Sequence, residues 1–299
     1  MDYSILKNLI TGRKGFDIPM FKDAVIQRNL KRQGYHVCDY IISEKVIAEL
    51  QAAFDKFVEL YDKPLPETFY ASGDAKSSPA RTHVLTSMKK LFVPEVQKLI
   101  RPEHARAEPG IFQIKPSSEK SELNSHQDAA LVDENKYFSV YAWASLTDNT
   151  RDNGALYVLP GSHRFGNVHR SNTTNWQFDG YEDIIKKYSK VLETKAGQII
   201  LFDCALIHGS LANNSGKIRV AASGCVMPKN APLIMSYIDK DTAAETVDIY
   251  QVNEDYFMND DIYARPSSKY PYLGNVKFKR LNLDRKSFEF YCKLNNWLS

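Results

Sequence analysis

The stretch Gln198-Ile-Ile-Leu-Phe-Asp-Cys-Ala-Leu-Ile-His208-Gly-Ser210 decides the fold. Its apolar run predicts a buried strand that continues to Ile207 and is followed at once by an imidazole. A buried imidazole needs a partner, so His208 is either a hydrogen-bonded structural residue or a ligand. The turn-forming residues Asn213-Asn-Ser-Gly216 predict that the chain then reverses and that a second strand brings Arg219 back beside His208.

Similar short runs recur through the middle of the chain. Each is rich in β-branched and aromatic residues and is bounded by turn-forming residues, as strands are. The runs are Ile111–Lys115, Tyr137–Leu146, Ala155–Leu159, Val191–Thr194, Gln198–Phe202 and Ile218–Met227. This pattern predicts a mainly β protein with flanking helices, whose core is a double-stranded β-helix, the cupin-like jelly roll.

Helical periodicity occurs on both sides of these strands. Residues 20–33 and 43–62 are predicted helices, the second with Ser43 as its N-cap, and a shorter helix begins near Pro94. A further helical stripe near the end of the chain consists of Phe288, Tyr291, Leu294 and Leu298. The strands are therefore expected to be enclosed by helices.

Length and composition fit one domain. With 299 residues, of which 43% are hydrophobic, the chain can bury one large core. We expect a single domain over residues 1–299. It would consist of a helical N-terminal part (1–105), a jelly-roll core (106–228) and a C-terminal extension (229–299).

The charge pattern limits the partners that the protein can bind, and the cysteines indicate the compartment in which it works. The net charge is +3, from 39 basic and 36 acidic residues, without the basic face that nucleic-acid binding requires. No apolar run is long enough to span a membrane, and the four cysteines are scattered, as reduced thiols are. We expect a cytoplasmic protein that binds a small molecule and neither nucleic acid nor membrane. A homodimer stays open.

A second stretch, His126-Gln127-Asp128, offers metal ligands. On an extended segment His126 and Asp128 project to the same side and Gln127 projects away. With His208 they give two imidazoles and a carboxylate, the set with which non-heme Fe(II) keeps positions open for a co-substrate and O₂. A lone His-x-Asp arises readily by chance among seven histidines, so this interpretation needs further support.

That support is a set of four blocks in a fixed order. They are Ser125-His-Gln-Asp128, Val140-Tyr-Ala-Trp143-Ala-Ser-Leu146, Asn153-Gly-Ala-Leu-Tyr-Val-Leu-Pro160-Gly-Ser-His-Arg164, and Leu206-Ile-His208-Gly-Ser210 with Arg219. Together they resemble the phytanoyl-CoA dioxygenase family of Fe(II)- and 2-oxoglutarate-dependent oxygenases. The resemblance covers about residues 20–228 and does not extend beyond them.

The resemblance implies roles for individual residues. His126, Asp128 and His208 would bind the iron, and Arg219 would pair with the distal carboxylate of 2-oxoglutarate. A planar guanidinium that stays charged suits that task. Around the co-substrate, the resemblance further implies that Ser210 donates from its hydroxyl and that Trp143 lies on the inner wall. It implies an amide contact from Gln113, for which Lys115 is the alternative.

The reaction implied by the resemblance is hydroxylation of an unactivated C–H bond in a small organic substrate, with succinate and CO₂ as co-products. Three diversions of the same iron chemistry stay open, namely desaturation, epimerisation and cyclisation in natural-product biosynthesis. A non-redox, cupin-like metal protein would need similar imidazoles but has no evident use for Arg219. A binding module without activity would leave the ligand set without purpose.

Three segments are expected at the mouth of the barrel. Residues 116–125 are predicted to form a loop that could act as a lid. Residues 165–190 are predicted to be an insertion with a helix over Glu182–Tyr188. Arg81 lies in a third rim segment, where it is either a contact for an anionic substrate or an ordinary surface arginine.

Overall fold

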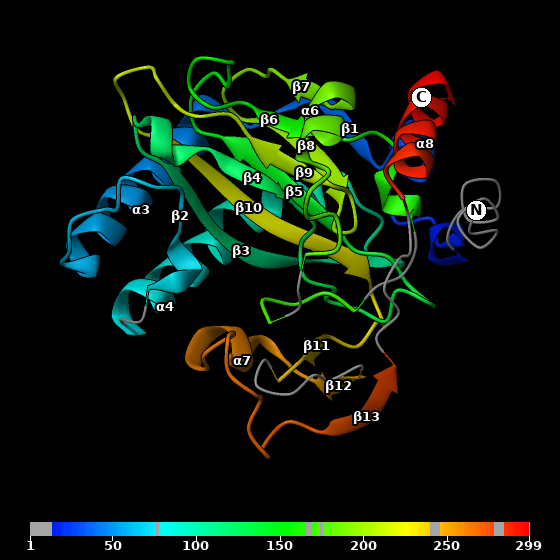
Figure 1. Ribbon diagram of the computed structural model, residues 1–299. Coiled ribbons are helices and arrows are strands. Elements are labelled where there is room, and N and C mark those ends of the chain that lie inside the picture. The colour runs from blue at the N-terminus through cyan, green and yellow to red at the C-terminus, as the bar shows by residue number, and fades with distance from the viewer. Residues whose placement is uncertain are drawn as a thin grey trace.

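Two antiparallel sheets form the centre of the computed structural model, which describes residues 14–75, 78–165, 169–173, 176–239, 246–277 and 284–298 (Figure 1). The larger sheet has the order β1-β8-β5-β10-β3-β2. Its strands are β1 (Tyr35–Ile41), β2 (Tyr70–Ala71), β3 (Ala105–Lys115), β5 (Val140–Ser145), β8 (Gln198–Asp203) and β10 (Arg219–Pro228). The smaller sheet, β4-β9-β6-β7, consists of β4 (Leu123–His126), β6 (Leu156–Val158), β7 (Lys190–Leu192) and β9 (His208–Ser210).

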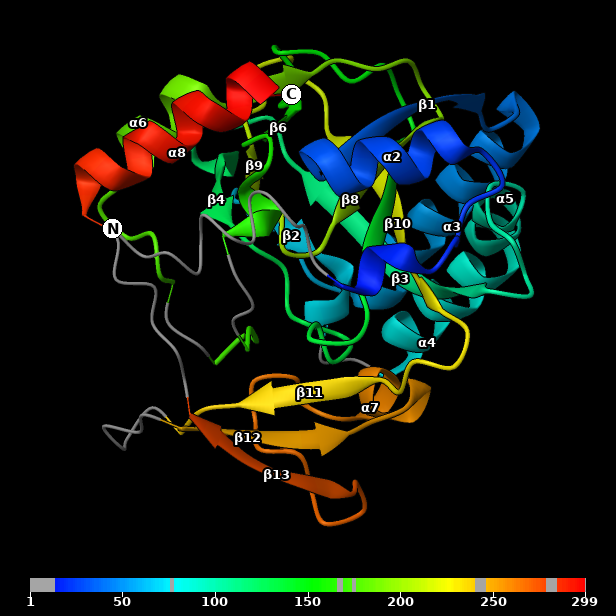
Figure 2. The same cartoon turned by 90° about the vertical axis from the view of Figure 1, so that its right-hand side faces the viewer.

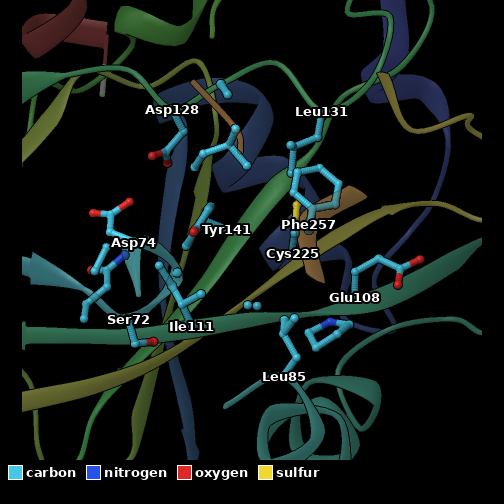
Figure 3. A pocket seen from close by; sticks show the side chains of 18 of the residues that line it. Ser72, Asp74, Leu85, Glu108, Ile111, Asp128, Leu131, Tyr141, Cys225 and Phe257 are labelled. Carbon is cyan, nitrogen blue, oxygen red and sulfur yellow. The ribbon is translucent and has the colours of Figure 1, made fainter. Parts of the chain in front are cut away.

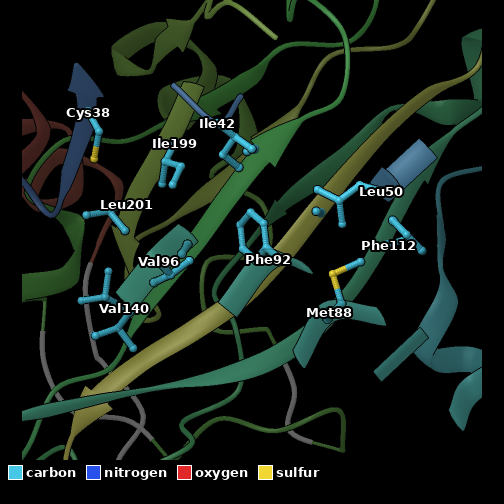
Figure 4. Packing of buried hydrophobic residues seen from close by; sticks show 14 of the residues in the cluster. Cys38, Ile42, Leu50, Met88, Phe92, Val96, Phe112, Val140, Ile199 and Leu201 are labelled. Carbon is cyan, nitrogen blue, oxygen red and sulfur yellow. The ribbon is translucent and has the colours of Figure 1, made fainter. Parts of the chain in front are cut away.

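The larger sheet is buried on both faces. Its outer face packs against the helices, through residues such as Phe112, Val140 and Ile199 (Figure 4). On its inner face Trp143 and Phe202 belong to one cluster with residues of the smaller sheet, including Leu156, Val158 and Leu192. Because side chains alternate along a strand, the inner face collects every second residue, and the space between the sheets can hold a site.

The helices lie mainly over the outer face. They are α2 (Ala24–Gln33), α3 (Glu44–Tyr61), α4 (Ser78–Ser87) and α5 (Val93–Gln97), with the 3₁₀ turns η1 (Lys14–Asp17) and η2 (Ser72–Asp74) and the π-helical turn η3 (Met88–Phe92). The Ser43 side chain accepts a hydrogen bond from the Val46 amide, which confirms the predicted N-cap of α3. In α3 the apolar stripe Leu50, Phe54 and Phe57 is buried against the sheet, as the periodicity predicted.

Two details of the opening prediction are wrong. The apolar run does not form one strand to Ile207, because β8 ends at Asp203 and the Asp203 carboxylate accepts from the Ala205 amide in a turn. His208 therefore opens β9 in the smaller sheet. Strand β10 pairs with β3 and β5 and not with β9, so the chain after Asn213 crosses from one sheet to the other.

The C-terminal extension, residues 229–299, contains three strands and a helix that the sequence pattern did not predict. Its strands β11 (Ile234–Tyr237), β12 (Thr246–Gln251) and β13 (Tyr272–Lys277) form a third sheet, and α7 (Glu254–Asn259) lies between β12 and β13 in the chain. Figures 1 and 2 show this unit below the two central sheets. The predicted last helix is confirmed as α8 (Arg285–Leu298), which packs on α6 (Glu182–Tyr188), also a predicted helix.

The predicted lid segment is partly ordered. It contains the 3₁₀ turn η4 (Glu119–Ser121), and β4 already begins at Leu123; a further turn, η5 (Ser162–Arg164), follows β6. All four cysteines are buried free thiols. Across the residues that the structure describes, no helix has both the length and the apolar character to cross a membrane.

Candidate active site

The three predicted metal ligands converge at one end of the smaller sheet. His126 and His208 are direct partners in the β4–β9 ladder, and their ring centroids lie 4.3 Å apart. Strand β4 ends at His126, so Asp128 does not lie on the strand as predicted but on the segment that follows it. Its carboxylate oxygens lie 3.9 Å from Nε2 of His126 and 3.8 Å from Nε2 of His208. One ligand atom from each residue fits within 4.8 Å of the others.

Backbone carbonyls orient both imidazoles. Nδ1 of His126 lies 2.8 Å from the Asn124 carbonyl, and Nδ1 of His208 lies 3.0 Å from the Leu206 carbonyl. A carbonyl only accepts, so Nδ1 of each ring carries a proton, and Nε2 of each ring faces the Asp128 carboxylate. Histidines that bind a metal are commonly held in this way by the nitrogen that does not bind it.

Burial keeps His208 neutral. Desolvation, reinforced by the neighbouring His126, lowers the pKa of His208 to about 4, although the Asp128 carboxylate acts in the opposite direction. The carboxylate itself is incompletely satisfied, since Asp128 Oδ2 is buried with no hydrogen-bond partner among the described residues. A neutral imidazole beside an unsatisfied carboxylate oxygen is ready to bind a cation.

Arg219 supplies a buried guanidinium at the start of β10. The residue is 1% exposed, and its Nη2 donates to the Gly154 carbonyl at 2.9 Å. Its Nε and Nη1 find no acceptor within the described part of the chain. Burial lowers the pKa of Arg219 to about 9, so the group remains charged at neutral pH. Two buried donors with a positive charge call for an anion.

Of the residues predicted around the co-substrate, Trp143 and Lys115 neighbour this guanidinium, and Gln113 bonds Trp143. Trp143 lies under Arg219, 5.2 Å from ring centroid to Cζ, and donates from Nε1 to Oε1 of Gln113 at 3.0 Å. Lys115 is the partner of Arg219 in the β3–β10 ladder and donates to the Ser121 carbonyl. Ser210 is buried, and its Oγ has no partner among the described residues.

Lys115 is a second buried basic group beside Arg219. Its side chain is fully buried, and desolvation together with the Arg219 charge lowers the pKa of Lys115 to about 7. The Glu122 carboxylate acts in the opposite direction. Lys115 therefore carries only part of a positive charge at neutral pH, and a bound dianion would favour its protonated form.

A cavity of about 720 Å³ opens beside the metal ligands. His126, Asp128, His208 and Gln113 line it, together with residues from α4, β3, β10 and the third sheet. Figure 3 shows Asp74 and Asp128 along one side of this space and Leu131, Phe257 and Glu108 along the other. The ligand trio therefore has access to a space of the size that small molecules occupy.

Comparison with known proteins decides the family. The sequence profile of the family described as Phytanoyl-CoA dioxygenase (PhyH) matches residues 30–221. The chain belongs to the phytanoyl-CoA dioxygenase family. This membership confirms the resemblance that the four sequence blocks indicated, and the match encloses all seven of the predicted site residues.

Individual relatives match over shorter lengths. The phytanoyl-CoA dioxygenase of Arabidopsis thaliana is 35% identical over 105 residues, which are 34% of this chain and 37% of that protein. The peroxisomal phytanoyl-CoA dioxygenase of Homo sapiens is 33% identical over 91 residues, 28% of this chain and 27% of that protein. The matched region thus spans only about a quarter to a little more than a third of the length of these curated family members.

A solved structure confirms the predicted jelly-roll fold of this family member. It is the epimerase SnoN, in complex with Fe³⁺, alpha ketoglutarate and nogalamycin RO, with a TM-score of 0.53 and 17% sequence identity. The likeness covers 88% of this chain and 97% of that chain. At this identity it concerns the fold alone.

The sequence of this family member did not reveal how Asp128 is held. Arg170 donates from Nε to the Asp128 backbone carbonyl at 2.9 Å, and its other guanidinium nitrogens bond the Glu134 carboxylate at 2.7 Å. Both side chains are buried. Residues 128, 134 and 170 share no periodic spacing, so only the folded chain shows that Arg170 positions the predicted carboxylate ligand.

Proposed function

We propose that the protein is an Fe(II)- and 2-oxoglutarate-dependent dioxygenase that hydroxylates an unactivated C–H bond of a small organic substrate. Succinate and CO₂ are the co-products. The family supports the oxygenase class and both cofactors. The observation that carries the proposal is the convergence of His126, Asp128 and His208 beside a cavity, with the unsatisfied guanidinium of Arg219 in the same fold.

The donor set fits ferrous iron. Two imidazole nitrogens and one carboxylate oxygen on one side of an ion leave several positions open, as in non-heme Fe(II) oxygenases. Asp128 Oδ2, which is otherwise an unsatisfied buried atom, would gain a cation. When bound, the iron with O₂ and 2-oxoglutarate supplies the oxidising power, and the protein holds the reacting groups in place.

The orphaned donors fit 2-oxoglutarate. Arg219 Nε and Nη1 and Ser210 Oγ are buried without partners in the described part of the chain, and a carboxylate would satisfy them. The Trp143 ring lies against the guanidinium, and Lys115, with a pKa of about 7, adds positive charge when it is protonated. A cupin-like protein without a co-substrate would bury these donors at a cost and without a purpose, which favours the oxygenase.

The cavity supports a small-molecule substrate. Because His126, Asp128 and His208 line it, a molecule bound there has C–H bonds close to the metal ligands. The selectivity of such chemistry depends on which bond the protein holds nearest. Desaturation, epimerisation and cyclisation would use the same residues and differ in their products. The single-domain organisation and the cytoplasmic location remain predictions, and a homodimer stays open.

The test is an anaerobic titration of metal-free protein with Fe(II) and then 2-oxoglutarate, followed by the visible metal-to-ligand charge-transfer band. We expect a band in the unaltered protein, none in Asp128→Ala, and a band that needs about a hundredfold more 2-oxoglutarate in Arg219→Ala. Arg151→Ala, at an exposed arginine, is the matched control and should leave the titration unchanged. Iron binding without any band would contradict the proposal.

A further inference from the structure

The C-terminal extension forms one wall of the cavity. Leu233, Met235, Phe257, Met258 and Ile262 line the cavity and all lie beyond residue 221, where the family match ends. They come from β11, from α7 and from the segments beside them, which lie under the central sheets in Figures 1 and 2. We call this unit, residues 233–239 and 246–277, the C-terminal wall.

Specific contacts fix the C-terminal wall to the rest of the protein. On one side Arg81 of α4 donates to the carbonyls of Met258 and Asp260 at 3.4 and 3.0 Å, so it anchors the end of α7. An ion pair of 3.0 Å joins Lys89 to Glu254. On the other side the Ile234 amide donates to the Leu131 carbonyl at 2.9 Å. Arg81 thus bonds the C-terminal wall and is not an ordinary surface arginine.

The body of the cavity is apolar. The C-terminal wall contributes Phe257 and Met258, and Figure 3 shows Phe257 near Leu131, with Leu85 and Ile111 across the space. The apolar residues that line it from the other elements include Val84, Leu85, Ile111, Leu131 and Met227. A cavity of about 720 Å³ with this lining suits an organic molecule of drug-like size whose surface is mainly apolar.

The charges that line the cavity are mostly neutralised within the protein. Lys89 pairs with Glu254 at 3.0 Å, and Glu108 pairs with Arg106 at 2.6 Å. Asp128 is a predicted metal ligand. The two lining cations also bond the protein: Nη1 of Arg81 donates to the Asp260 carbonyl and Lys89 pairs with Glu254, while Nε of Arg81 finds no acceptor in the described part of the chain.

Asp74 is the exception. Its carboxylate accepts a hydrogen bond from the Tyr263 hydroxyl at 3.3 Å, and no cation of the described residues lies within ion-pairing distance of it. Desolvation raises the pKa of Asp74, against the lowering effects of Tyr263 and Arg81. Asp74 is exposed, so it borders the cavity at its solvent edge, where a cationic group of a bound molecule would complement its charge.

We propose that this cavity binds a mainly apolar molecule carrying a basic nitrogen, which pairs with Asp74, and that the C-terminal wall sets this specificity. The inference rests on the proposed function, because the molecule would lie beside the predicted iron ligands. It also sets this chain apart from an acyl-thioester oxygenase, since a coenzyme A moiety brings several phosphates and the two lining cations, Arg81 and Lys89, already bond the C-terminal wall.

Binding to the metal-free protein tests the charge preference. The probes are decylamine, decanol, decanoate and decanoyl-coenzyme A, which share one alkyl chain and differ in the head group, and calorimetry measures each affinity. We expect decylamine to bind at least about tenfold more tightly than the other three. Asp74→Asn should abolish that preference and leave decanol unchanged. Asp55→Asn, at an exposed carboxylate of α3, should change nothing.

Two variants test the C-terminal wall. Phe257→Ala and the more conservative Ile262→Thr should weaken decylamine and decanol alike, by about three- to tenfold, and keep their ratio. Phe290→Ala, at a side chain 51% exposed on α8, is the matched control. Circular dichroism confirms that each variant is folded.

The outcomes separate this inference from the proposed function. Equal affinity for decylamine and decanol, or tighter binding of decanoate or decanoyl-coenzyme A, overturns the basic-nitrogen assignment. Unchanged binding in both wall variants overturns the role of the wall. Because these measurements need neither iron nor 2-oxoglutarate, they can fail while the charge-transfer band is present, and the band can be absent while decylamine is preferred.

Discussion

At the residue scale, the site is marked by polar atoms that are buried and unsatisfied. Asp128 Oδ2, Ser210 Oγ and Arg219 Nε and Nη1 have no partner among the described residues. Each such atom costs about 1–3 kcal/mol unless a ligand satisfies it. A cation at Asp128 and a carboxylate at Arg219 and Ser210 would satisfy all of them. Binding of the predicted ligands would thus remove the free-energy cost of these unsatisfied atoms.

Acid should destabilise the metal-free protein through His208. Its pKa is about 4 in the folded protein against an ordinary 6.5, so between these values the unfolded chain binds more protons and stability falls as the pH falls. Between pH 7.5 and 5 we expect this residue to cost about 2 kcal/mol of unfolding free energy. Urea unfolding at the two pH values measures the loss.

The variant His208→Gln serves as the control for that titration. It cannot titrate, so its loss of stability between the same two pH values should be smaller than that of the unaltered protein by the same amount. Identical losses in the two proteins would show that His208 is not kept neutral by the fold.

At the element scale, the turn before β6 lies between the two buried basic groups. Gly154 has a φ of +86°, and its carbonyl accepts from Arg219. A Cβ at this position would lie 2.2 Å from Cδ of Lys115 and 2.7 Å from the Leu211 carbonyl. Because Gly154 has no side chain, the turn can approach Lys115 and Arg219 closely. The turn therefore helps to shape the predicted 2-oxoglutarate end of the site.

Gly154→Ala should therefore be more damaging than an ordinary glycine substitution. We expect a loss of about 3 kcal/mol, the sum of left-handed strain and overpacking, together with weaker 2-oxoglutarate binding. Gly180→Ala is the matched control, because Gly180 has a φ of +82° and nothing within 4 Å of the added Cβ. It should lose only about 1 kcal/mol. Equal losses in chemical denaturation would contradict the close approach of Lys115.

At the scale of the whole molecule, the C-terminal wall and the central sheets form the cavity together. The wall is held through side chains of α4 and through backbone hydrogen bonds near Leu131, and its own sheet has only three strands. Small sheets gain little stability by themselves. The wall should therefore depend on its contacts with the rest of the protein more than the central sheets depend on the wall.

Arg81→Met should loosen the wall without unfolding the jelly roll. Two hydrogen bonds to the carbonyls of Met258 and Asp260 are lost, so backbone amides in residues 246–263 should exchange faster, by about tenfold. Amides of β5 and β8 should keep their protection. Hydrogen–deuterium exchange with mass spectrometry measures both regions.

Arg28→Met, at an exposed arginine of α2, controls for the loss of a surface charge and should leave exchange unchanged in both regions. Faster exchange throughout the protein in Arg81→Met would show that Arg81 supports the whole fold and not the wall. No change in residues 246–263 would show that these hydrogen bonds do not anchor α7.

The sequence by itself determined what depends on neighbouring residues. The stripe of α3 and its Ser43 cap, the helix α6 and the segments of most central strands are read from local periodicity and turn-forming residues. The chemistry of His126, Asp128, His208 and Arg219 is also fixed by residue type, and the spaced blocks identified the family. These features were available because each is encoded within a few residues of chain.

Only the tertiary structure decided what depends on residues distant in the chain. It divided the apolar run after Gln198 between two sheets, placed β10 beside β3 and β5, and brought Arg170 to the Asp128 carbonyl. It also assembled residues 233–277 into a wall of the cavity. These arrangements depend on how buried faces and polar groups from distant parts of the chain pack together on folding. Short-range sequence patterns do not encode that packing.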